Sequence, residues 1–154
     1  MDFDIPSLLS WLQSDDKELQ HTSLECLCNA ILFNNERDFF ERLKPARFVR
    51  ALLTLFSDDN ITDEVLELNT RTLHYLLEYD TSNLNLIKIE HYRIFCLRLD
   101  IADLSTVDGN DLALRILKVC ITAKFNCYPI FFNFFRFYYC FFLKFSASGF
   151  YNLN

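Results

Sequence analysis

Hydrophobic positions recur along this chain at helical spacing, and the same pattern returns twice. Stripes of apolar residues three and four positions apart predict amphipathic helices over residues 17–33 and 63–79, and over a third segment that restarts at Asp111. Equivalent positions of the three helices stand 46 and then 47 residues apart. Three positions of each helix carry this repeat: Leu19, Leu24 and Leu27; Val65, Thr70 and Leu73; Leu112, Leu117 and Cys120.

Polar corners separate these helices from shorter ones that precede them. We expect a short helix over 7–14, a second from Pro45 to Phe56 and a third over about 89–99. Asp, Asn and Ser cluster at 14–16, 57–60 and 107–110, which predicts a turn after each short helix. Asp16 is the expected N-cap of the helix over 17–33, and residues 62–64 are expected to cap the helix over 63–79.

The spacing lies in the range of about 40 to 47 residues that is typical of armadillo and HEAT repeats, in which paired helices stack to share a core. The sequence therefore predicts an all-α fold, an armadillo/HEAT-like α-solenoid fragment of about three stacked helical units. We expect one such domain over 1–123, with Leu27, Leu73 and Cys120 as equivalent core positions.

The composition changes at about residue 124. Ten of the 17 Phe lie between 125 and 150, and no Asp or Glu follows Asp111. A membrane anchor over 125–145 is one reading, but Arg136 near its centre would cost about 2.5 to 3.5 kcal/mol on insertion scales. We favour the interpretation that residues 124–154 form an atypical tail, which is either disordered or the product of a gene model that runs past an exon end.

Charge and residue usage exclude several function classes. A net charge of −6 argues against a nucleic-acid-binding or anionic-membrane-binding protein, which needs a basic face. The six Cys contain no Cys-x-x-Cys pair and the two Gly form no phosphate loop, so we expect no metal, cofactor or small-molecule site. Acidic residues at helix starts are explained by capping rather than catalysis. The acidic N-terminus lacks the features of a secretory signal, so we expect a protein of the cytoplasm or nucleus.

Four strings of residues add a resemblance to a known family. The segments 8–13 (LLSWLQ), 24–28 (LECLC), 63–68 (DEVLEL) and 71–78 (RTLHYLLE) resemble the N-terminus of a large HECT-domain E3 ubiquitin ligase. The resemblance covers about residues 5–122. It implies armadillo-like repeats here, with ankyrin repeats and a C-terminal HECT domain in the parent chain. None of the six Cys matches the thioester-forming Cys of that domain, so the resemblance implies a non-catalytic scaffold that docks partners or ubiquitination substrates.

A row of polar residues is our candidate for the docking surface. Glu25, Arg71 and Lys118 stand two residues before the three equivalent core positions, about 200° around the helix, and Asn29 and Tyr75 follow one turn later. We call these five residues the polar ladder. A merely solvated face is the plainer interpretation. For the whole chain, the alternatives are an unrelated armadillo/HEAT adaptor and a small helical protein anchored in a membrane by its aromatic segment.

Overall fold

The structure is a computed structural model that describes residues 4–34, 37–101, 103 and 105–123, and their side chains except 96, 100, 101, 117 and 120–123. Every regular element in this described part is helical, which confirms the all-α prediction. The elements are α1 (Ile5–Leu12), α2 (Lys17–Phe33), α3 (Arg37–Leu43), α4 (Pro45–Phe56), α5 (Asp63–Tyr79), the 3-10 helix η1 (Thr81–Leu86), α6 (Ile89–Ile101) and α7 (Val107–Ala123).

The helices divide between two compact units, a first unit that ends at Leu86 and a second unit that begins at Ile87. The single domain expected over 1–123 stays a prediction. The atypical tail expected over 124–154, including the candidate membrane segment, lies outside the described residues.

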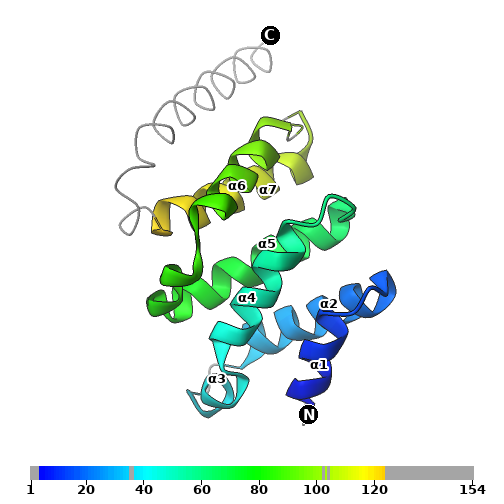
Figure 1. The fold of residues 1–154 in the computed structure, drawn as a ribbon, viewed down its shortest axis with the longest axis vertical. Helices are drawn as coiled ribbons and strands as arrows, with labels where there is room; N and C mark the ends of the chain where they lie inside the picture. The colour runs from blue at the N-terminus through cyan, green and yellow to red at the C-terminus, as the bar shows by residue number, and fades with distance from the viewer. Residues whose placement is uncertain (1–3, 35–36, 102, 104, 124–154) are drawn as a thin grey trace. The chain divides into compact units, whose positions relative to one another are not determined.

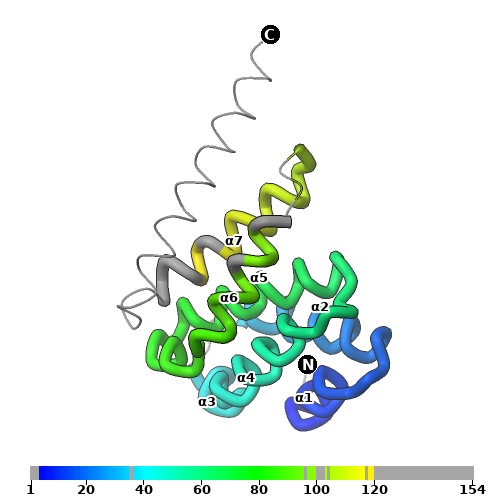
Figure 2. The backbone as a smooth tube through the Cα atoms, turned by 45° about the horizontal axis from the view of Figure 1, so that its top comes forward, coloured from blue at the N-terminus to red at the C-terminus, as the bar shows by residue number. Residues whose placement is uncertain are grey.

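In the first unit two helical hairpins lie side by side. Helix α1 packs against α2, and α4 packs against α5. Both helices of the first hairpin contact the second hairpin: α1 contacts α4, and α2 contacts α5 (Figure 1). Figure 2 follows the same backbone from a second angle, with η1 returning from the end of α5 toward α4. The sequence repeat of 46 residues therefore corresponds to one helical hairpin.

Side-chain caps fix where the long helices of this unit begin. The Asp16 carboxylate accepts hydrogen bonds from the backbone N–H of Glu18 at 2.9 Å and of Leu19 at 3.2 Å. The Thr62 hydroxyl accepts from the N–H of Val65 at 3.4 Å, one repeat later. Both predicted caps are confirmed, and α2, α4 and α5 have the bounds that the sequence predicts.

A buried polar clasp joins the two helices of each hairpin in the first unit. The hydroxyl of Ser23 on α2 donates to the carbonyl oxygen of Leu8 on α1 at 2.6 Å. The amide of Asn69 on α5 donates to the carbonyl oxygen of Leu52 on α4 at 3.1 Å. Ser23 and Asn69 are fully buried and stand 46 residues apart, so the clasp repeats with the hairpin. The hydrophobic pattern alone did not reveal these contacts.

Burial follows the repeat along α2 and α5, with one exception. Seven positions of α2, from Gln20 to Ile31, are buried and have buried equivalents 46 residues later in α5. Leu27 and Leu73 have no exposed surface, which confirms both as core. Leu19 was expected in the same stripe but is 36% exposed, whereas its equivalent Val65 is buried. The prediction for Leu19 was wrong: both residues are the third of their helix, but α5 packs against α2, α4 and η1, whereas the main contacts of α2 are with α1 and α5, so the start of α2 is less covered.

Two short elements of the first unit were not predicted. Helix α3 has seven residues, too few to be stable by propensity alone, and buries Phe39, Phe40 and Leu43. The ring of Phe40 stacks on Tyr79 at the end of α5, with ring centroids 3.7 Å apart. Long-range packing therefore holds α3 in place. The 3-10 helix η1 contacts both α4 and α5.

The second unit is a hairpin of α6 and α7. Residues 107–110 were expected to form a turn, but α7 already begins at Val107. Gly109 lies in the first turn of this helix. The position requires a glycine, because a Cβ there would collide with the carbonyl oxygen of Asp103. The Thr106 hydroxyl accepts a hydrogen bond from the N–H of Gly109 at 3.0 Å and caps the helix. The expected turn was wrong, since this Gly serves a close approach rather than a bend.

Candidate functional site

Four residues of the polar ladder lie on the two helices that pack together in the first unit. Glu25 and Asn29 on α2 are exposed, whereas Arg71 and Tyr75 on α5 are half-buried. Lys118 is an exposed residue of α7, in the second unit. The structure therefore places these four residues on two helices that contact each other, and the ladder as a docking surface, Lys118 included, stays a prediction.

The guanidinium of Arg71 is engaged within its own helix. It donates to the carboxylate of Glu67, one turn earlier on α5, and forms an ion pair with it. Burial acts to lower the pKa of Arg71, but the charge and hydrogen bond of Glu67 outweigh burial and raise it. The thiol of Cys28 on α2 and the phenol of Tyr75 act in the same direction, which places Arg71 at the seam between α2 and α5. The Arg71 guanidinium is thus fixed in position by Glu67 rather than freely mobile.

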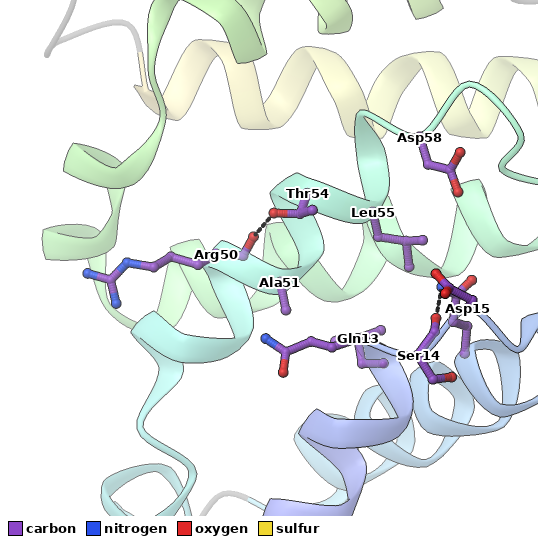
Figure 3. A pocket seen from close by; sticks show the side chains of 10 residues that line it. Gln13, Ser14, Asp15, Arg50, Ala51, Thr54, Leu55 and Asp58 are labelled. Atoms are coloured by element: carbon purple, nitrogen blue, oxygen red, sulfur yellow. Dashed lines mark hydrogen bonds between the residues drawn. The ribbon is translucent and has the colours of Figure 1, made fainter.

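A second candidate is a pocket between the first polar corner and α4, with a volume of about 470 Å³. We call it the corner pocket. Its apolar wall consists of Leu12, Ala51 and Leu55, which are all buried. Figure 3 shows Asp15 and Asp58 at one end of the pocket and the Arg50 side chain at the other. Its remaining lining residues are Gln13, Ser14, Gln20 and Thr54.

The acidic end of the corner pocket joins two successive corners of the repeat. Asp15 comes from the corner between α1 and α2, and Asp58 from the corner between α4 and α5. The ammonium of Lys17 binds the Asp58 carboxylate at 2.8 Å and links the corners. For Asp15, the described residues supply no ion pair or side-chain hydrogen bond.

One buried polar side chain in the pocket wall is only half satisfied. Gln20 is 6% exposed, and its Nε2 donates to the carbonyl oxygen of Ser14 at 2.5 Å. Its Oε1 finds no hydrogen-bond partner in the described part of the chain. The residue 46 positions later is Leu66, which is buried. The core position of Gln20 thus takes an apolar residue in the next hairpin, so packing alone does not require a polar side chain there.

Sequence reasoning missed the corner pocket, although two signals pointed to it. The first is the repeated Asp pair at 15–16 and 58–59, which also fits a plain helix corner, and the second is Gln20, a polar residue within an apolar stripe. Within the described residues, no group of three His, Cys, Asp or Glu side chains could hold a metal ion. Over the same part of the chain, no helix is both long enough and apolar enough to cross a membrane.

Comparisons with known proteins identify relatives at the level of sequence. No family model matches the chain, and no solved structure matches it. The chain is 36% identical over 124 residues to the E3 ubiquitin-protein ligase hecd-1 of Caenorhabditis elegans, an alignment that covers 75% of this chain and 5% of that protein. It is 33% identical over 124 residues to the E3 ubiquitin-protein ligase Ufd4 of Drosophila melanogaster, covering 77% of this chain and 4% of that protein.

These alignments confirm the resemblance that residues 5–122 indicated. The chain matches only about one twentieth of the length of either relative. Identity above 30% across three quarters of a chain of 154 residues indicates that the aligned regions share a common ancestor. Over most of its length, this chain is therefore homologous to a short segment of these two E3 ubiquitin-protein ligases.

Proposed function

We propose that this chain is a non-catalytic scaffold segment of a HECT-type E3 ubiquitin-protein ligase, which docks partner or substrate proteins for ubiquitination. The observation that carries the proposal is the match to two E3 ubiquitin-protein ligases across three quarters of the chain. The paired helices of the first unit support it, because stacked hairpins of the armadillo-like kind offer a continuous surface to protein partners. The cytoplasm or nucleus is the proposed location.

The proposed docking surface is the polar ladder, with its exposed residues of α2 as the first contacts. Glu25 and Asn29 reach solvent. Arg71 is held by Glu67, so it can meet a partner without losing side-chain freedom on binding. Tyr75 adds a half-buried ring, the residue type that supplies large contact area at interfaces. Lys118, on α7 of the second unit, belongs to the proposal through the sequence repeat alone.

A competition experiment tests the proposal. The chain, added in excess to the full-length Drosophila ligase Ufd4, should slow ubiquitination of that ligase's substrates because both would compete for the same docked partner. Self-ubiquitination of the ligase should not change, since docking of substrate is not needed for it. Glu25→Lys combined with Asn29→Lys should abolish the competition. The matched control is Arg47→Glu, which alters charge on the exposed side of α4 at a residue that belongs neither to the polar ladder nor to the corner pocket.

The competition has two results that would overturn the proposal. Unchanged substrate ubiquitination at a large excess of folded chain would remove the docking role. Equal competition by the α2 double variant and by the unaltered chain would remove the polar ladder as the docking surface.

A further inference from the structure

Helix α2 carries a row of apolar residues along a side that the first unit leaves largely open. Leu19, Cys26 and Phe33 stand seven residues apart, so they lie within about 20° of one line along the helix. We call these three residues the α2 stripe. Leu19 is exposed, Cys26 is half-buried and Phe33 is 83% exposed. The main helix contacts of α2, with α1 and α5, do not cover the stripe.

The repeat indicates that the α2 stripe is a helix-packing surface. The residues 46 positions later on α5 are Val65, Thr72 and Tyr79. Val65 and Thr72 are buried, and the ring of Tyr79 stacks on Phe40 of α3. Helix α5 packs against α2 as well as against its own hairpin partner α4. The α2 stripe thus has the apolar character of a packed surface without the cover that its equivalent has on α5.

The short helix α1 does not extend this apolar surface. The carbonyl groups that accept the two clasps stand 44 residues apart, on α1 and α4. By this spacing Asp4, at the start of α1, corresponds to Phe48 of α4. Ser7 corresponds to Ala51. Phe48 and Ala51 are buried, whereas Asp4 is exposed and its carboxylate accepts a hydrogen bond from the Ser7 hydroxyl. A whole further hairpin would have to bury this polar pair, which is costly, so the surface suits a single helix laid along α2.

We propose that the α2 stripe binds the α2 stripe of a second copy of this chain, with the two helices antiparallel about a twofold axis. Leu19 precedes Cys26 by seven residues, and Phe33 follows it by seven. An antiparallel pair centred on Cys26 therefore sets Leu19 of each copy against Phe33 of the other. The two small Cys26 side chains meet at the axis and let the helices approach closely. The stripe is thus complementary to itself, as a twofold interface requires.

The size and charge of this contact predict a weak dimer. One helix of 17 residues from each copy makes a small interface, in the class below about 1,200 Å² that is typical of transient complexes. Glu25 flanks the centre of the stripe, so the dimer brings two like charges to the same side of the helix pair. We expect a Kd on the order of 10 to 100 μM. Added salt should lower this Kd, because it screens the repulsion.

Sedimentation equilibrium of the whole chain, over a wide range of concentrations, tests the proposal. The mass should rise from that of the monomer to that of a dimer and then stay constant. Phe33→Glu should raise the Kd at least about tenfold, because it sets a charge into the apolar contact of both copies. The matched control is Val107→Glu, which adds the same charge at an apolar residue of α7 that is 76% exposed. Thermal unfolding should show that both variants keep the fold, since both residues are at the surface.

Chemical cross-linking locates the contact. A short bismaleimide reagent should join the thiols of the two Cys26 residues, and peptide mapping by mass spectrometry should identify that link. Cys26→Ser should remove the cross-link but leave the sedimentation behaviour close to that of the original chain. Neither measurement needs a partner protein, so this proposal can fail without affecting the proposed docking function.

Three outcomes would overturn the proposal. The first is a chain that stays monomeric at every concentration, which would leave the α2 stripe to a helix of another protein. The second is an equal loss of association in Phe33→Glu and Val107→Glu, which would place the contact elsewhere. The third is a cross-link from Cys26 to a different cysteine of the other copy, which would indicate a head-to-tail arrangement.

Discussion

The two units of this protein differ in the side chains that join the helices of their hairpins. In the first unit, each hairpin buries an apolar stripe and adds a polar clasp, Ser23 to Leu8 and Asn69 to Leu52. In the second unit, the position 47 residues after Asn69 is Ile116, which is fully buried and cannot form such a bond. The repeat therefore conserves burial more strictly than it conserves polarity. Hairpins of one chain can use either means to join their two helices.

Burial along α7 supports this equivalence between the units. Leu66, Asn69 and Thr72 of α5 are buried, and so are the residues 47 positions later, Ala113, Ile116 and Val119. The side chains of Leu117 and Cys120, which were expected in the core, lie outside those described. Helix α7 differs mainly in starting about one turn earlier relative to the repeat.

The largest expected effect comes from the apolar core of the first unit. Leu73 has no exposed surface, so Leu73→Ala should lower the free energy of unfolding by about 2 to 5 kcal/mol through lost burial and the cavity left behind. Urea denaturation followed by circular dichroism measures this change. Leu114→Ala in the second unit is the control, because Leu114 is 46% exposed and should cost less than about 0.5 kcal/mol. A Leu73→Ala cost as small as the control's would refute the assigned register.

Removal of a clasp should have the next largest effect. Asn69→Ala should cost about 1 to 3 kcal/mol, because it removes a buried hydrogen bond to Leu52 and leaves a small void. Chemical denaturation checks this value. Asn69→Leu fills the void without restoring the bond, so the difference between the two variants separates packing from hydrogen bonding. If Asn69→Leu is as stable as the original chain, the clasp contributes no more stability than a buried apolar side chain at this position.

The helix cap gives a smaller effect. Asp16→Ala should cost about 1 kcal/mol, because two backbone N–H groups of α2 lose their acceptor. Thr62→Ala should cost less, since its single bond to Val65 is longer at 3.4 Å. Thermal unfolding of both variants measures the order. A larger loss for Thr62→Ala would contradict the capping geometry.

The smallest effect concerns pH and belongs to the second unit. His91 Nδ1 accepts a hydrogen bond from the backbone N–H of Lys88 at 2.8 Å, at the start of α6. Burial lowers the pKa of His91 from its ordinary value of 6.5; Glu90 opposes this shift and Lys88 adds to it. Between the lowered pKa and 6.5, the unfolded chain binds more protons at this site. Stability should therefore rise with pH through this window and level off above it.

His91→Gln is the matched variant for this pH effect. Gln keeps an acceptor at the third position of the helix but does not titrate. The stability of the second unit, measured from pH 5 to 8 by denaturation, should lose part of its pH dependence in this variant. An unchanged pH profile would show that other groups cause the dependence.

Periodicity and caps predicted the long helices of this chain because both are local properties. Asp16, Pro45 and Thr62 mark the helix starts, and the apolar stripe marks the buried face. The missed features depend on residues distant in sequence. Helix α3 depends on the stacking of Phe40 on Tyr79, and the corner pocket is lined by residues of two separate corners, Asp15 and Asp58 among them. Gly109 suggested a turn because the approach of Asp103 cannot be seen in a sequence.

The polar ladder was only partly predictable for the same reason. Helical spacing correctly placed Glu25 and Asn29 at the surface. The spacing of four residues between Glu67 and Arg71 is compatible with their ion pair, but it could not reveal that Arg71 is partly covered at the seam of α2 and α5. A residue at the boundary between two helices changes its exposure with small differences in packing, which a period of 3.6 residues does not encode.

The most direct test of the contrast between the units is amide hydrogen exchange of the whole chain, with and without Asn69→Ala. The polar clasp belongs to the first unit, so the variant should lower protection in α4 and α5, and to a lesser degree in α2, which packs on α5. Protection in α6 and α7 should stay unchanged, because the hydrogen bond that the variant removes lies within the first unit. An equal loss of protection in α6 and α7 would contradict the account.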